Sequence, residues 1–294
     1  MPRSNKKRPV RRGSSSGDVF IPVIILLAGI TALSLLIAFV WQKWQDKYDP
    51  DYLYPDKNSS SQAEEPSESS APEESSSSSS SEPEQASVQF GQPVPESERV
   101  RSEYFDDAIF IGDSLTTGIQ LYNILPDTTV LASVGINLDN IGTKAVIGEE
   151  GSQQTILEAS KQYDAGKIYI MLGANGLKGL GTDQTVKYYR SFVDEVRAAH
   201  PDAIIYVQSI LPINEQKFEA NYGYSMTNAE IDECNAALLK MTEEAQVYYV
   251  DVASVIKDET GGLPADYTTD GLHFKGEYYN KWIDYLKEHT VPAQ

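Results

Sequence analysis

From about residue 95 onward, short apolar runs alternate with amphipathic segments, and this alternation restricts the fold more than any other feature of the chain. The runs are continuously apolar, which is typical of parallel strands buried on both faces. We predict five strands, at residues 108–111, 129–132, 168–172, 204–208 and 247–251. Helices are expected directly after Ser114 and at residues 153–163, 184–199, 228–244 and 277–288. Such an order predicts a three-layer α/β/α domain around a central parallel sheet of about five strands.

The first third of the chain has a composition that excludes it from this domain. Residues 59–92 are dominated by Ser, Glu and Pro, with an unbroken serine run at residues 75–81. Such a segment has too little apolar surface to offset the entropy cost of ordering. We therefore expect residues 42–95 to form a disordered linker and residues 96–294 to form the folded domain.

Residues 19–41 contain no charged side chain and follow a basic cluster, formed by Arg3, Lys6, Lys7, Arg8, Arg11 and Arg12. Their number matches the roughly 20 residues that cross a hydrocarbon core and exceeds the ~7–15 apolar residues of a cleavable signal peptide. Bulky residues, including Trp41 and Trp44, stand where a cleavage site would carry small ones. The positive-inside rule then predicts a single-pass cell-membrane protein with residues 1–18 in the cytoplasm and the domain outside. A cleaved signal peptide is the alternative.

The overall charge and the cysteine count limit which partners the protein can bind and which cross-links it can form. A formal net charge of −19 argues against a nucleic-acid partner, because binding phosphates requires clustered Lys and Arg on the folded part. Cys234 is the single cysteine, so no internal disulfide forms. We expect Cys234 to be a half-buried apolar residue of a helix, and no metal-ligand spacing accompanies it.

Ligand sites in parallel sheets lie beyond the carboxyl ends of the strands. The first predicted strand is followed by Gly112-Asp113-Ser114-Leu115, at the start of a helix. A serine on such a strand-to-helix turn exposes its Oγ above the sheet, which suits a nucleophile. The alternative is an ordinary serine N-cap.

Two further strand ends carry groups suited to binding an oxyanion. Gly135 follows the second strand and Asn175 follows the third. A tetrahedral acyl intermediate needs preorganised donors, and the backbone amides of Ser114 and Gly135 with the Asn175 side chain would supply them. For Asn175-Gly176 the alternative is a tight turn, since Asn-Gly is a strong turn dipeptide.

A candidate general base stands just before the last predicted helix. Asp270 and His273 are three residues apart, so one turn presents both side chains to the same pocket. A carboxylate on one imidazole nitrogen fixes the tautomer of a histidine that accepts a serine proton. An Asp-Gly loop with a surface histidine is the alternative. His200 lies where a helix ends before a proline and His289 follows the last helix, so neither is a good base candidate.

Taken together, these segments resemble the four conserved blocks of the SGNH (GDSL-like) hydrolase family, over about residues 104–288. The resemblance rests on Gly112-Asp113-Ser114-Leu115, Gly135, Gly173-Ala174-Asn175 and Asp270 to His273. It implies a flavodoxin-like sheet and ester hydrolysis through an acyl-serine intermediate, without metal or organic cofactor. In that mechanism Ser114 is the nucleophile, His273 the base and Asp270 its orienting carboxylate. Two positions depart from the family pattern: Gly176 replaces an often acidic residue, and Ile111 replaces a second glycine.

The predicted location outside the membrane suggests an envelope substrate, and an O-acetyl ester of a bacterial wall glycan is the first expectation. The alternatives are a wall O-acetyltransferase with the same triad, a lipase or lysophospholipase, and a non-catalytic wall-binding module. Residues 217–227 carry Phe218, Tyr222 and Tyr224, whose rings suit sugars. These aromatic residues could equally cover the end of the sheet.

Overall fold

The computed structural model describes residues 88–292. The predicted cytoplasmic tail (1–18), the predicted anchor (19–41) and the predicted linker up to residue 87 lie outside the described residues. Within residues 88–292, no helix combines the length and the apolar character that crossing a membrane requires.

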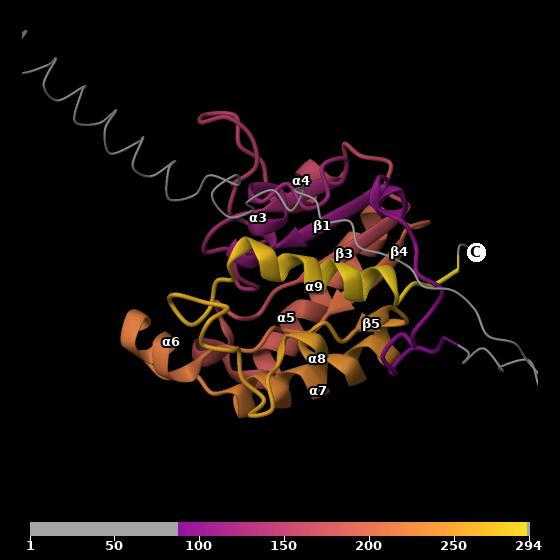
Figure 1. Ribbon diagram of the computed structural model, residues 1–294. Helices are drawn as coiled ribbons and strands as arrows, with labels where there is room; N and C mark the ends of the chain where they lie inside the picture. The colour runs from indigo at the N-terminus through magenta and orange to yellow at the C-terminus, as the bar shows by residue number, and fades with distance from the viewer. Residues whose placement is uncertain (1–87, 293–294) are drawn as a thin grey trace, which may run out of the picture. The chain divides into compact units, whose positions relative to one another are not determined.

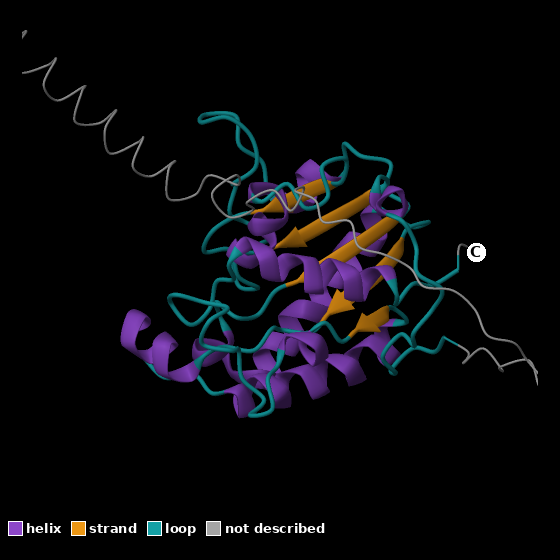
Figure 2. Ribbon diagram, in the orientation of Figure 1, coloured by secondary structure: helices purple, strands orange, loops and turns teal. Residues whose placement is uncertain are grey.

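Five parallel strands form one sheet in the order β2-β1-β3-β4-β5 (Figure 2). The strands are β1 Ala108–Gly112, β2 Thr129–Ala132, β3 Lys167–Met171, β4 Ile204–Gln208 and β5 Tyr248–Val250. Every residue of β1 is buried, which explains why this strand reads as an unbroken apolar run. All five predicted strands are present, and the predicted three-layer fold is confirmed.

Helices cover the sheet in two groups. One group consists of α3 Ser114–Leu121, α8 Ala253–Ile256 and α9 Gly276–Lys287, and α9 crosses in front of the sheet in Figure 1. The other consists of α4 Ile156–Ser160, α5 Leu177–Ala199 and α7 Asn228–Ala245. A 3-10 turn, η1 Ser102–Phe105, precedes β1. The helix α6 Glu215–Tyr222, which was not predicted, stands out at the edge of the domain (Figure 1).

Local sequence signals explain where two of these helices begin. Thr155 precedes α4 and Thr227 precedes α7, and each forms a capping box with a glutamate in the first turn of its helix, Glu158 and Glu230 respectively. Cys234 lies on α7 and is fully buried as a free thiol, deeper than the half-buried position that we predicted. Cys234 therefore packs in the core as a small apolar side chain.

A row of aromatic side chains crosses the sheet in register. Phe110, Tyr169, Tyr206 and Tyr248 are paired positions on β1, β3, β4 and β5. Successive ring centroids lie 4.8, 4.5 and 5.9 Å apart. The row continues into Phe90, whose ring lies 4.8 Å from that of Tyr248. These contacts join four strands and a segment from before the predicted domain boundary into one core.

Residues 88–95 belong to the folded domain, so the prediction that the linker extends to residue 95 is wrong for these positions. Pro93 pairs with Tyr249, and the amide of Val94 donates to the Tyr249 carbonyl at 2.8 Å. Val94 is buried, and Val88 packs against the core. The short apolar pattern of Val88, Phe90 and Val94 follows directly on the serine-rich run. The composition of that run made the apolar pattern hard to recognise from sequence.

Candidate active site

Ser114 occupies the first turn of α3, immediately beyond the end of β1. The turn needs Gly112, because a Cβ there would lie 1.9 Å from Thr116 Oγ1 and 2.7 Å from the Met171 carbonyl oxygen. The carboxylate of Asp113 caps α3 by accepting from the amide of Leu115 at 3.0 Å. Ser114 is therefore held on a tight strand-to-helix turn, half-buried at the carboxyl edge of the sheet.

Asp270 and His273 share a tight loop just before α9. Asp270 Oδ1 accepts from the amides of Leu272 and His273, both at 2.9 Å, and from Thr268 Oγ1 at 3.2 Å. Gly271 has φ +93°, and a Cβ there would lie 2.2 Å from the backbone nitrogen of Phe218. Glycine is required for this close approach of α6 to the loop.

The structure brings the three predicted catalytic side chains into one chain of contacts. Ser114 Oγ lies 2.9 Å from His273 Nε2, and His273 Nδ1 lies 2.7 Å from Asp270 Oδ2. An ionised carboxylate only accepts hydrogen bonds, so Nδ1 carries a hydrogen and donates it to Asp270. In the neutral imidazole Nε2 is then an acceptor, placed to receive the hydrogen of the serine hydroxyl.

The electrostatics of the pair favour a base at Nε2. Burial by itself would raise the pKa of Asp270, but hydrogen bonds from the His273 side chain and from the Leu272 and His273 amides hold that pKa well below its ordinary value. The hydrogen bond to Asp270 raises the pKa of His273, against the opposing effect of burial. An imidazolium formed by proton transfer would therefore be stabilised by an ionised Asp270.

Asp113 adds a second carboxyl group near the imidazole. Burial raises the pKa of Asp113 to about 6, although the Leu115 amide and the His273 charge both oppose this effect. The charge of Asp113 in turn raises the pKa of His273. The charges of Asp113 and His273 therefore stabilise one another.

The predicted oxyanion residues follow three adjacent strands. Gly112 pairs with Ala132 of β2 and with Met171 of β3, so Ser114, Gly135 and Asn175 follow aligned strand ends. Asn175 Nδ2 donates to the Ile136 carbonyl at 3.0 Å, which ties the loop after β3 to the loop after β2. One of its two amide hydrogens is used in this way, and the second is available to a ligand.

Sequence reasoning missed the part that Tyr222 plays in this arrangement. The Tyr222 hydroxyl donates to Asp270 Oδ2 at 3.1 Å and lies 3.4 Å from His273 Nδ1. The aromatic residues at 217–227 are the available signal in the sequence, but by themselves they indicate only a group that faces a sugar or covers the sheet. The helix that carries Tyr222, α6, was itself not predicted.

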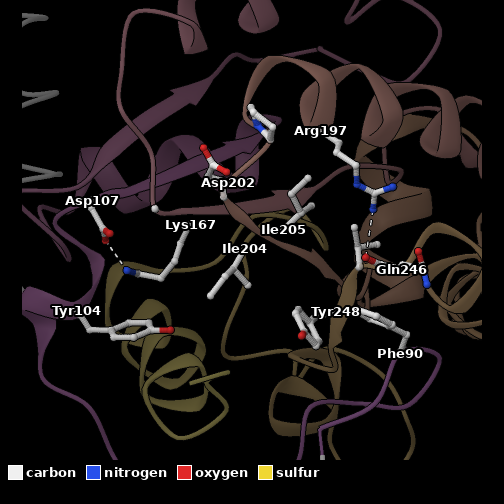
Figure 3. Close-up of a pocket in the computed structure, with 14 residues that line it drawn as sticks. Phe90, Tyr104, Asp107, Lys167, Arg197, Asp202, Ile204, Ile205, Gln246 and Tyr248 are labelled. Carbon is white, nitrogen blue, oxygen red and sulfur yellow. Dashed lines mark hydrogen bonds and ion pairs between the residues drawn. The ribbon is translucent and has the colours of Figure 1, made fainter. Parts of the chain in front are cut away.

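Figure 3 shows a hollow of about 720 Å³. Its lining residues place it at the amino ends of the strands, whereas the predicted site residues follow the carboxyl ends. It is lined by the first residues of β3, β4 and β5, which are Lys167, Ile204 and Tyr248. Lys167 forms an ion pair with Asp107 at 2.5 Å. None of the five predicted site residues lines this hollow. Among residues 88–292, no three His, Cys, Asp or Glu side chains cluster closely enough to hold a metal ion.

Comparisons with solved structures identify similar folds. A protein from Streptococcus pneumonia, provisionally described as a platelet activating factor, is 23% identical, with 63% of this chain and 87% of that chain covered and a TM-score of 0.51. A carbohydrate esterase family 3 protein from Talaromyces cellulolyticus is 16% identical, with 61% and 92% covered and a TM-score of 0.42. The periplasmic domain of a lipopolysaccharide acetyltransferase from Salmonella ser. Paratyphi A is also 16% identical, with 61% and 82% covered and a TM-score of 0.42.

No curated protein sequence matches this chain. The profile of the GDSL-like Lipase/Acylhydrolase family, however, matches residues 110–281, which is more than half of the 294 residues. The matched segment begins within β1 and ends within α9, so it includes Ser114, Asp270 and His273. The chain belongs to the GDSL-like lipase/acylhydrolase family and is a carboxylic ester hydrolase.

Proposed function

We propose that this hydrolase removes O-acetyl groups from a glycan of the bacterial cell envelope, with Ser114 as nucleophile. The contacts from Ser114 through His273 to Asp270, at 2.9 and 2.7 Å, are the observation that carries this proposal. They join a hydroxyl, a base and an orienting carboxylate in the order that nucleophilic acyl transfer requires.

The reaction would take place in two steps. Ser114 Oγ attacks the ester carbonyl carbon while His273 Nε2 takes the hydroxyl proton, and the sugar oxygen leaves with that proton. Water then attacks the acyl-serine, gives a proton to His273 and releases acetate, while Ser114 Oγ recovers its proton. The amides of Ser114 and Gly135 and the free hydrogen of Asn175 Nδ2 would stabilise the oxyanion in both steps.

The exposed side chains beside the site support a polymeric substrate. Val134, next to Gly135, is 72% exposed, and Tyr222 and Tyr224 are also exposed beside the Asp270 loop. Exposed aromatic rings suit sugar faces, and an open edge admits a chain that could not enter a closed cavity. The expected glycan would lie across α6 and the loop after β2.

The domain organisation is part of the same proposal. We infer that residues 19–41 anchor the protein in the cell membrane, with residues 1–18 in the cytoplasm, because an uncharged stretch follows a basic cluster. Residues 42–87 would then act as a linker that lets the hydrolase reach the envelope. Protease added to intact protoplasts should remove the domain and leave a short membrane fragment, whereas full protection of the domain would contradict this orientation.

The substrate is tested by supplying acetylated wall glycan and p-nitrophenyl esters of increasing acyl length. The enzyme is the protein from residue 88 onward, compared with the full chain. We expect release of acetate from the glycan and a preference for acetyl over long acyl esters. The Ser114→Ala protein is the control for background hydrolysis. A preference for long acyl chains would instead favour a lipase, and transfer of acetyl to an added glycan would favour a transferase.

A further inference from the structure

The helix α6 is fixed against the loop that carries Asp270 and His273. The amide of Asn214, which caps α6, donates to the Gly271 carbonyl at 2.8 Å. Lys217 Nζ donates to the Thr268 carbonyl at 2.8 Å and to the Ala265 carbonyl at 2.5 Å. This part of α6 and the loop therefore form one unit.

Tyr222 is the last residue of α6 and brings a hydroxyl group to the same unit. Its ring stacks on Phe218 at a centroid distance of 4.6 Å and meets Tyr224 edge-on at 6.5 Å. Phe218 is buried, so the stack holds the Tyr222 ring on a fixed support. The hydroxyl then reaches Asp270 Oδ2 at 3.1 Å.

The Tyr222 hydroxyl and the His273 imidazole bond to the same carboxylate oxygen. Asp270 Oδ2 accepts from Tyr222 at 3.1 Å and from His273 Nδ1 at 2.7 Å. Each donor that stabilises the charge of a carboxylate leaves that carboxylate less able to stabilise a neighbouring cation. We propose that Tyr222 is a positioning residue, whose hydroxyl fixes Asp270 and limits how strongly this carboxylate favours the protonated form of His273.

The other charged and polar groups near His273 stay the same in wild type and in a Tyr222→Phe variant. Asp113, at the start of α3, acts on His273 through its charge, and Ser114 contacts Nε2. Lys217 of α6 bonds to backbone carbonyls of the loop. Replacing the Tyr222 hydroxyl by hydrogen leaves all three groups in place. A change in His273 titration would therefore report the lost hydrogen bond.

The test is a titration of the histidine imidazole signals by NMR in wild type, Tyr222→Phe and Tyr224→Phe. We expect Tyr222→Phe to raise the pKa of His273 by about half a unit, the size expected for one hydrogen bond to a partly exposed carboxylate. Tyr224 contacts the rings of Phe218 and Tyr222, so Tyr224→Phe should leave the His273 pKa at the wild-type value. The acidic limb of kcat/KM should move with the NMR value. An unchanged His273 pKa in Tyr222→Phe would overturn the proposal.

A second variant covers the case in which Tyr222→Phe does not fold. Replacing Tyr222 by 3-fluorotyrosine keeps the ring and makes the hydroxyl a stronger donor, so the pKa of His273 should fall; a value that stays or rises would overturn the proposal. The inference rests on the proposed roles of Asp270 and His273. The NMR titration needs no activity, whereas hydrolysis by Asp270→Asn and His273→Ala tests those roles independently. The two failures are therefore distinguishable.

Discussion

Two serine–histidine pairs of nearly equal length lie in different regions of the domain. His273 Nε2 is 2.9 Å from Ser114 Oγ at the carboxyl edge of the sheet, and His200 Nε2 is 3.0 Å from Ser160 Oγ between α4 and the end of α5. The distance between serine and histidine does not distinguish the two pairs. They differ in the groups that surround them.

The hydrogen bond has opposite directions in the two pairs: Ser114 donates to His273, whereas His200 donates to Ser160. Ser160 Oγ donates its hydrogen to the Leu157 carbonyl at 2.8 Å, so it can only accept from His200. His200 is 7% exposed and Ser160 is fully buried, and burial lowers the pKa of His200. This imidazole is a donor in a closed contact, which shows that a serine–histidine distance identifies no nucleophile without a carboxylate and an approach for substrate.

The largest expected difference between the pairs is in turnover. We expect His273→Ala to lower kcat by on the order of 10⁵-fold, because the base and the nucleophile act as one unit. His200→Ala should leave kcat within about threefold while costing roughly 1–3 kcal/mol of unfolding free energy from the lost buried contact. Steady-state kinetics and urea unfolding measure the two effects. Equal losses of kcat in two folded variants would remove the distinction.

Asp270→Asn removes from the first pair the carboxylate that is hydrogen-bonded to its histidine. The amide can no longer hold His273 in the required tautomer, so we expect kcat to fall by about 10⁴-fold with the fold intact. Thr268→Val removes a donor to Asp270 Oδ1 and an acceptor for the Gly271 amide but leaves the Asp270 carboxylate in place. It is the control and should have a far smaller effect on kcat. A mild loss in Asp270→Asn would contradict the orienting role of this carboxylate.

Asn175→Ala probes the surroundings of the catalytic pair. Loss of one oxyanion donor should lower kcat by roughly 10²–10³-fold with little change in KM, since such a donor binds the transition state more strongly than the ester. An unaffected kcat would leave the triad intact and show that the oxyanion site is built differently beside Gly176.

The smallest expected effects concern pH. NMR titration should place the pKa of His273 above the ordinary value of about 6.5 and that of His200 below it. Because His273 must be neutral to accept a proton, activity should rise with pH through its raised pKa. A depressed histidine pKa means that the unfolded state binds the proton first, so His200 costs stability as pH falls below about 6.5. His200→Gln should therefore lose less unfolding free energy on acidification than wild type, and an equal or larger loss would contradict its buried, neutral state.

The strands and the chemical motifs were accessible from sequence for different reasons. Strands such as β1 are buried throughout, and their apolar runs are visible in any short window. Ser114 and His273 are 159 positions apart, but each lies in a short pattern at a strand or helix boundary. The topology rule that parallel strands end at one edge then places them together.

The features that sequence reasoning missed depend on tertiary contacts. In α6 only Phe218 is buried, so the helix has almost no apolar periodicity to detect. The contact between Tyr222 and Asp270 depends on how α6 packs against the loop that carries Asp270, and no local sequence pattern predicts it. Residues 88–95 are ordered by pairing with β5, which the neighbouring serine-rich composition concealed.

The most direct test of the central claim is labelling with a fluorophosphonate probe, followed by peptide mapping, because the probe reacts only with an activated serine. We expect a single adduct on Ser114, no adduct on Ser160, and no labelling of a folded Ser114→Ala protein. Labelling that persists in Ser114→Ala, or an adduct on another serine of the native protein, would contradict the assignment of Ser114 as the nucleophile.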